Sequence, residues 1–137
     1  LLNNVDTFVI FGTTGEGSLI SLKEKKKIII KLLQEYNIHL IVGISNISTY
    51  DSCKEIKYFS SLNIDGFLVL TPTYIKTNQL GLYNHYSKIS KYTSKDIYLY
   101  DIKVRTGQDL DLETISNLQK IKNIKETNFI CVLFFRN

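Results

Sequence analysis

Residues 40–70 read LIVGISNISTYDSCKEIKYFSSLNIDGFLVL, and this stretch by itself predicts one complete structural unit. It opens on an apolar run at 40–42 and closes on a second at 67–70, each with the length and composition of a buried strand. Between them, residues 49–62 carry apolar side chains at helical spacing. Because neither run alternates with polar residues, we expect two parallel strands joined by a helical crossover.

The same alternation continues on both sides of this unit. Apolar runs recur about every 30 residues, and a helix-like segment with one apolar face separates each pair. Repeated strand–helix order predicts a parallel sheet with right-handed crossovers, in either a TIM barrel or an open doubly wound sheet. The further strand candidates are residues 8–11, 97–100 and 129–135, and the further helix candidates are residues 21–36, 80–92 and 112–121.

Composition excludes several classes of protein. Hydrophobic residues make up 44% of the chain, which excludes a disordered tail, and two cysteines are too few for a disulfide scaffold. No apolar run approaches the roughly 20 residues needed to span a bilayer, so we expect no membrane partner. His39 and His85 lack metal-ligand spacing, and we expect no metal site.

The formal net charge of +4 does not indicate a nucleic-acid partner. Lysine is abundant together with isoleucine, asparagine and tyrosine, while alanine is absent and only two arginines occur, which is the signature of an AT-rich coding sequence. The basic residues form no dense patch. The longest basic run, residues 25–27, lies on a predicted helix, and we interpret it as a solvated face.

Polar and glycine-containing segments follow the predicted strands. The first, GTTG at residues 12–15, could let backbone amides approach a carboxylate or phosphate, or it could be a plain turn. It is neither a P-loop nor a dinucleotide fingerprint. Because barrels and open α/β sheets place active sites at the carboxyl ends of their strands, we expect a site formed from residues 12–16, 43–46, 71–74, 100–101 and 105–107.

In this order and at these spacings, the segments resemble the dihydrodipicolinate synthase family of pyruvate-dependent class I aldolases. The resemblance extends over residues 1 to about 127 and rests on GTTGE at 12–16, LTPTYIK at 70–76, QLGLYNHY at 79–86, LYDIKVRTG at 99–107 and IKE at 124–126. It implies an α/β fold, a TIM barrel, of which this chain would form about four to five of the eight units.

The resemblance also sets the expected domain organisation. Residues 1–137 would form one partial-barrel domain without the family's first strand and helix and without its last units. The chain opens on Leu1 and contains no methionine, so we expect further residues upstream. A barrel lacking several strands would leave open sheet edges.

The family's reaction is a Schiff-base condensation. A lysine would bind pyruvate covalently, and the resulting enamine would attack L-aspartate 4-semialdehyde, a step in lysine and diaminopimelate biosynthesis. The resemblance therefore implies a cytoplasmic lyase that needs no cofactor beyond the covalent Schiff base. It also implies a homo-oligomer, a dimer of dimers, with pyruvate and aspartate semialdehyde as its small-molecule partners.

Each site residue is assigned by its match to a family motif. Thr13 and Tyr100 match the proton relay, and Tyr74 matches a tyrosine that reaches across the dimer to complete it. Thr14 matches a residue that holds the pyruvate carboxylate, and Arg105 matches the arginine that binds the carboxylate of the semialdehyde. These roles suit the side chains, since hydroxyls can form a hydrogen-bonded proton path and the arginine fork binds carboxylates bidentately.

Lys125 matches the Schiff-base lysine, with one departure from the family pattern. Only Ile124 separates Asn123 from Lys125, where the family has about four apolar residues, so about three residues are missing. Without that gap, Asn128 would occupy the lysine position. If Lys125 fails in this role, the chain cannot form the Schiff base.

Three alternatives to the synthase stay open at this point. Another pyruvate-dependent enzyme, of the N-acetylneuraminate lyase or 2-keto-3-deoxy sugar acid aldolase type, would share the first motif but generally lack Arg105. A catalytically inactive remnant would keep the family sequence without turnover. A Rossmann-like binding domain ranks last, because the chain has no dinucleotide fingerprint.

Overall fold

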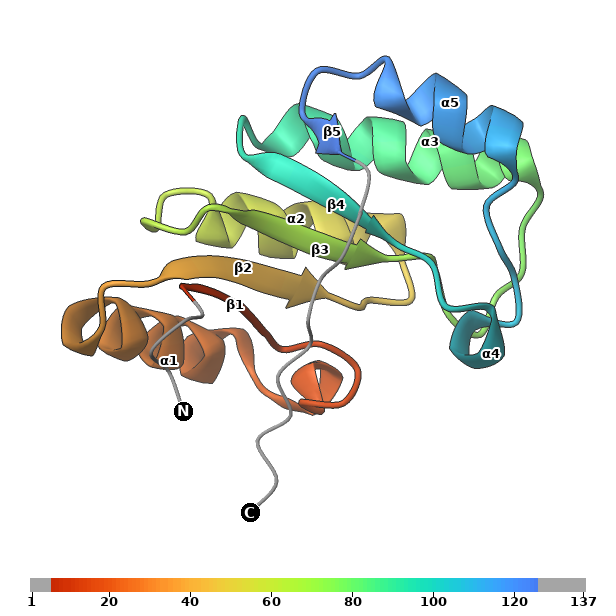
Figure 1. Ribbon diagram of the computed structural model, residues 1–137. Coiled ribbons are helices and arrows are strands. Elements are labelled where there is room, and N and C mark those ends of the chain that lie inside the picture. Colours follow the sequence, from red (N-terminus) through yellow and green to blue (C-terminus); the bar gives the residue numbers. More distant parts are fainter. Residues whose placement is uncertain (1–5, 126–137) are drawn as a thin grey trace.

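The computed structural model describes residues 6–125, in which strands and helices alternate along the chain (Figure 1). The strands are β1 (Thr7–Ile10), β2 (His39–Ile44), β3 (Gly66–Leu70), β4 (Asp96–Tyr100) and β5 (Ile124–Lys125). The helices are α1 (Leu22–Glu35), α2 (Thr49–Phe59), α3 (Gln79–Ile89), α4 (Lys103–Thr106) and α5 (Leu112–Gln119), with short 3-10 turns η1 (Gly17–Leu19) and η2 (Ser90–Tyr92).

The strands form one parallel sheet whose order follows the sequence, β1-β2-β3-β4-β5. A doubly wound sheet reverses its strand order near the middle and carries helices on both faces. In this sheet the order never reverses, and the core between sheet and helices lies on one face only. The architecture is therefore a segment of a barrel, and the doubly wound alternative is excluded.

Alternation along the strands divides the apolar side chains between the two faces. The larger core packs strand residues such as Val42 and Phe67 against the helices. The second face carries a smaller cluster that consists of strand residues alone, namely Val9, Ile41, Leu68, Tyr98 and Tyr100. In a closed barrel this second face lines the interior. The residues of this cluster that lie nearest the carboxyl ends of the strands are next to the edge where we expected the site.

Helix starts are fixed by side-chain caps. Ser21 followed by Glu24 is the sequence pattern of a capping box, and the structure forms it at the start of α1: the Glu24 amide donates to Ser21 Oγ at 3.3 Å, and the Ser21 amide donates to Glu24 Oε2 at 3.1 Å. Ser48, Asn78 and Asp111 cap α2, α3 and α5 in a similar way. Each longer helix thus begins at a defined residue, which also fixes the length of the loop before it.

A short fifth strand, β5, lies at Ile124–Lys125, where the apolar runs predicted no strand. The strand that we expected at residues 129–135 lies outside the described residues. Asn123 fixes the start of β5, because its Nδ2 donates to the carbonyls of Ser90 and Thr93 at 3.1 and 2.9 Å. The strand therefore starts directly after an anchored residue, and Lys125 is only its second residue.

His85 is a buried histidine between two helices. It lies on α3 with 3% of its surface exposed, and its Nδ1 is 2.8 Å from the hydroxyl of Thr49 at the start of α2. Burial lowers its pKa from 6.5 to about 4. The ring is therefore neutral in the folded protein at pH 7, and it packs between α2 and α3.

This burial makes folding stability depend on pH. As pH falls from 6.5 towards 4, the unfolded chain protonates His85 while the folded protein does not. We expect the free energy of unfolding to decrease over this window by up to about 3 kcal/mol through this residue. His85→Gln keeps a hydrogen-bonding partner for Thr49 and cannot titrate. Urea unfolding at several pH values should show a smaller acid dependence in the variant, and equal dependence would contradict the prediction.

Two negative findings concern the residues that the structure describes. No helix between residues 6 and 125 has both the length and the apolar character needed to cross a membrane. Over the same residues, no three histidine, cysteine, aspartate or glutamate side chains gather as a metal site would require. Cys53 is buried and free, and Cys131 lies outside the described residues.

Candidate active site

The carboxyl edge of the sheet brings two of the predicted site residues together. A narrow hollow, too small to hold a water molecule, lies where β1, β2 and β4 end, and both Thr13 and Tyr100 line it. Gly43 and Ser45 form its wall from β2, and Leu70 contributes from β3. Of the five segments that we expected at this edge, parts of three border the hollow, namely residues 12–13, residues 43–45 and Tyr100.

The GTTG segment is a tightly folded turn. The amides of Gly15 and Gly17 both donate to the carbonyl of Gly12, at 3.1 and 3.4 Å. Phe11 and Glu16 flank the turn with positive φ values of 60° and 50°, which are uncommon for residues with side chains. This geometry leaves Thr14 exposed and turns Thr13 towards the hollow.

Gly43 is what allows this turn to approach the sheet. A Cβ atom on Gly43 would lie 2.5 Å from the carbonyl oxygen of Phe11, which is too close for any side chain. The neighbouring chain at Phe11 and Gly12 is backbone, so no rotamer change can relieve the contact. The placement of Thr13 therefore depends on a glycine in the adjacent strand.

Gly43→Ala should displace the turn and lower the free energy of unfolding by about 1–3 kcal/mol, because the clash falls on backbone atoms. Gly12→Ala is the matched control, since a Cβ there meets nothing within 4 Å. Urea unfolding of both variants tests the prediction. Equal stability of the two variants would show that the approach of Phe11 to Gly43 is not tight.

A buried ion pair lies beneath the turn. Lys25 of α1 and Glu55 of α2 are 4% and 3% exposed, and Lys25 Nζ lies 2.5 Å from Glu55 Oε1. The same ammonium stands over the ring of Phe11, 5.6 Å from its centre. Asn46 donates to the other carboxylate oxygen at 2.6 Å. The pair thus links two helices with the loops that follow β1 and β2.

This pair corrects the interpretation of residues 25–27 as a solvated face. Lys27 is exposed, but Lys25 is buried because it lies on the same side of α1 as Ile29, one turn further on. That spacing was the available signal, since position 25 falls on the apolar stripe of the helix. Nothing in the sequence, however, identified Glu55 as its partner.

Tyr74 lies on the loop after β3, outside the hollow. Its side chain is 90% exposed, and its backbone has φ 70°. The amide of Ile75 donates to the carbonyl of Thr73 at 2.8 Å, so Tyr74 is the central residue of a γ-turn with positive φ, a rare and strained conformation. The structure of this chain therefore presents Tyr74 outward, away from Thr13 and Tyr100.

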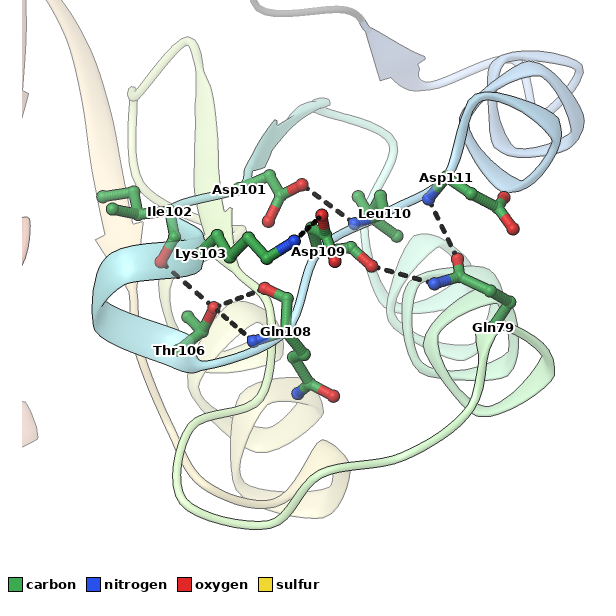
Figure 2. Close-up of polar contacts among 9 residues, drawn as sticks. All are labelled: Gln79, Asp101, Ile102, Lys103, Thr106, Gln108, Asp109, Leu110 and Asp111. Carbon is green, nitrogen blue, oxygen red and sulfur yellow. Dashed lines mark hydrogen bonds and ion pairs between the residues drawn. The ribbon is translucent and has the colours of Figure 1, made fainter.

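Arg105 is exposed on the short helix α4, between β4 and α5. The loop around it is held by internal hydrogen bonds (Figure 2). Thr106 Oγ1 donates to the carbonyls of Ile102 and Gln108, and Asp101 accepts from the Leu110 amide at 2.9 Å. Burial raises the pKa of Asp101. These contacts within the loop hold Arg105 just beyond the end of β4. Arg105 itself does not line the hollow.

Lys125 is not brought together with these residues. It pairs in register with Tyr98, two residues before Tyr100, and its Nζ donates to the Lys122 carbonyl at 3.0 Å. The same Nζ lies 3.9 Å from Asp96 Oδ1 at the start of β4. The structure therefore places Lys125 below the carboxyl edge, at the level of Tyr98. The physical reason is the short approach from the anchored Asn123; Asn128 lies outside the described residues.

The fold and the order of the site segments match proteins already known. The Dihydrodipicolinate synthetase family matches residues 1–128. A 4-hydroxy-tetrahydrodipicolinate synthase from Clostridium perfringens strain SM101 is 36% identical over 131 residues, which are 92% of this chain and 45% of that protein. The chain thus spans about half the length of the curated relatives it matches.

Solved structures agree with this match. A monomeric dihydrodipicolinate synthase variant superposes with a TM-score of 0.84 at 36% identity, over 92% of this chain and 44% of that one. The chloride-inhibited synthase from Acinetobacter baumannii, solved in complex with pyruvate, superposes with a TM-score of 0.81 at 34% identity, over 90% and 44%. The five strands described here are thus part of a TIM barrel, and the chain belongs to the dihydrodipicolinate synthetase family.

Proposed function

We propose that this chain carries the proton-relay side of the active site of a 4-hydroxy-tetrahydrodipicolinate synthase. The observation that supports the proposal most directly is the convergence of Thr13 and Tyr100 on one hollow at the carboxyl edge of the sheet. In the proposed reaction, pyruvate forms a Schiff base with a lysine, and its enamine adds to the aldehyde carbon of L-aspartate 4-semialdehyde. The covalent link to lysine replaces any cofactor.

The relay residues have the chemistry that this reaction requires. Schiff-base formation expels water from a carbinolamine, so a proton must reach the leaving hydroxyl, and a second proton must leave the methyl carbon when the enamine forms. A phenol with an ordinary pKa near 10 exchanges such protons when a hydrogen-bonded hydroxyl lies beside it. Tyr100 would supply the phenol and Thr13 the adjoining hydroxyl, while Thr14 would hold the pyruvate carboxylate.

Arg105 favours the synthase over other pyruvate-dependent aldolases. The second substrate of the synthase carries a carboxylate, and a guanidinium binds that group with two parallel hydrogen bonds. Arg105 is exposed beyond the end of β4, where a second substrate would approach the hollow. The aldehyde partners of sugar-acid aldolases carry hydroxyl groups in place of this second carboxylate, so an arginine at this place has no comparable use.

The position of Lys125 favours a second candidate, a family member without turnover. With its Nζ bonded to the Lys122 carbonyl, Lys125 must be displaced along β5 by two residues, about 6.6 Å, to stand level with Tyr100. The synthase proposal keeps Lys125 as the nucleophile and requires that displacement. The inactive candidate accepts the observed position.

Borohydride trapping separates the two candidates. The protein is incubated with pyruvate and sodium borohydride, and the adduct is located by mass spectrometry of peptides. A pyruvyl adduct on Lys125 supports the synthase, and added aspartate semialdehyde should then compete with trapping. Trapping with N-acetylneuraminate in place of pyruvate would indicate the lyase type. No adduct under conditions that label the Clostridium perfringens relative would overturn the synthase proposal for this chain.

The proposal also implies an oligomeric state and a cellular location for the protein. Because Tyr74 points outward with 90% of its surface exposed, it would complete the relay only in a neighbouring copy, so we propose a homo-oligomer, a dimer of dimers. Amino-acid biosynthesis would place the reaction in the cytoplasm. Light scattering of Tyr74→Ala beside the unaltered protein tests whether this side chain contributes to the contact.

A further inference from the structure

We propose that Gln108 is a positioning residue that joins the loop bearing Tyr74 to the loop bearing Arg105. The inference concerns two loops whose catalytic roles rest on the proposed function, but the joint itself is a feature of this chain. Gln108 lies after α4 and is 8% exposed. Neither composition nor motif order singled it out.

The side chain of Gln108 holds both ends of the Tyr74 loop. Its Nε2 donates to the Pro72 carbonyl at 2.6 Å, and its Oε1 accepts from the Thr77 amide at 3.0 Å. A carboxamide is suited to this place because it offers a donor and an acceptor side by side. Glutamate would keep the acceptor and lose the donor, and an apolar side chain would lose both.

The two hydrogen bonds of the Gln108 side chain lie on either side of the strained turn at Tyr74. Tyr74, at φ 70°, is the central residue of the γ-turn closed by Ile75 and Thr73. Unfavourable backbone conformations persist only where the surrounding structure determines them. Pro72 and Thr77 are both bonded to one buried side chain, so the two ends of the loop are held a fixed distance apart. Residues 73–76 must span that distance, and this constraint maintains the turn at Tyr74.

The backbone of Gln108 is also held by a hydrogen bond. Thr106, which is 5% exposed, donates through Oγ1 to the Gln108 carbonyl at 2.7 Å and lies next to Arg105 in α4. Figure 2 shows Gln108 leaving this bonded segment with its side chain directed away from Thr106. The backbone of Gln108 therefore belongs to the Arg105 loop, while its side chain belongs to the Tyr74 loop.

The carboxamide of Gln79 also connects the loop after β3 with the loop after β4. Gln79, the first residue of α3, donates to the Asp109 carbonyl at 2.8 Å and accepts from the Asp111 amide at 3.1 Å (Figure 2). These two partners lie between Gln108 and α5. The loops after β3 and β4 are thus cross-linked twice, and Gln108 is the buried link nearest to Tyr74.

Amide hydrogen exchange measured by NMR on the full chain tests the joint. In Gln108→Met both hydrogen bonds are lost, so exchange of the Thr77 and Ile75 amides should accelerate about tenfold. In Gln108→Glu the acceptor is retained, so the Thr77 amide should stay protected while signals of the Pro72 end and of Tyr74 shift. Gln34→Met, at an exposed position of α1, is the matched control.

Each outcome decides the inference. Faster exchange confined to residues 73–77, with the sheet amides unchanged, supports the joint. Unchanged exchange at Thr77 in Gln108→Met overturns it, and acceleration throughout the sheet overturns it as well, since that would be general destabilisation. Should Gln108→Met fail to fold, Gln108→Glu decides by the signals of Tyr74, and unshifted signals overturn the inference.

Kinetics separate failure of this inference from failure of the proposed function. With synthase activity present, Gln108→Glu should raise KM for aspartate semialdehyde about tenfold, because the displaced loop misplaces Arg105, and it should slow borohydride trapping of pyruvate, because Tyr74 shifts with the Pro72 end of its loop. Unchanged KM together with unchanged trapping overturns the positioning role. Absence of all activity in the unaltered protein would remove the proposed function, and the exchange measurements would still decide the joint.

Discussion

Glu55→Ala should lower the free energy of unfolding by about 3–5 kcal/mol, the largest stability effect that we expect from one substitution outside the apolar core. The substitution leaves the ammonium of Lys25 buried at 4% exposure without its carboxylate. It also removes the acceptor of the Asn46 amide. Water cannot easily replace these partners, because both charged side chains lie between α1 and α2 rather than at the surface.

Two controls isolate the buried charge. Glu35→Ala removes one partner of the exposed pair Lys31–Glu35 and should change stability by less than about 0.5 kcal/mol. The double variant Lys25→Met with Glu55→Leu removes both charges and fills similar space, so it should recover most of the loss. Urea unfolding monitored by circular dichroism measures all three. A double variant as unstable as Glu55→Ala would show that packing, not the unpaired charge, causes the effect.

The pair also connects stability to the site. Lys25 lies over the ring of Phe11, whose backbone has φ 60° and whose carbonyl rests against Gly43. Loss of the ammonium position would therefore loosen the residue that precedes the GTTG turn. Thr13 belongs to this turn, so we expect its environment to change in Glu55→Ala even at temperatures where the protein remains folded.

Local sequence pattern predicted much of the fold for a physical reason. Strand and helix periodicity and the cap at Ser21 depend on residues within one turn or one strand of each other. Even the meeting of Thr13 with Tyr100 follows from a general property of parallel sheets, whose carboxyl ends share one edge. The choice between barrel and doubly wound sheet needed the observed strand order, because periodicity does not report which face a helix covers.

Local pattern did not predict the features that depend on distant partners. Lys25 belongs to a basic run, and only the carboxylate of Glu55, 30 positions away, makes its burial tolerable. Lys125 matched a family motif, yet its place along β5 is set by the anchoring of Asn123 to the end of α3 and the turn after it. Gln108 belonged to no motif, since its two partners lie on the preceding loop.

Tyr100→Phe should reduce turnover of the proposed synthase reaction by about 10²–10⁴-fold, because the substitution removes the phenolic proton and leaves the ring in place. Tyr100 ends β4 and lines the hollow with Thr13. Its loss should slow both formation of the Schiff base and conversion to the enamine, since each step moves a proton at the bound keto acid. The fall should therefore be found in kcat and in kcat/KM alike.

Tyr98→Phe is the matched control, because Tyr98 lies on the same strand and the same face, two residues deeper. Burial, together with the carboxylates of Asp96 and Asp65, raises the pKa of Tyr98. It should keep nearly full activity. Stopped-flow trapping of pyruvate and steady-state turnover measure both variants. Equal losses would assign the effect to packing of the inner face, and an active Tyr100→Phe would require another proton donor at the hollow, for which Thr13→Val is the next test.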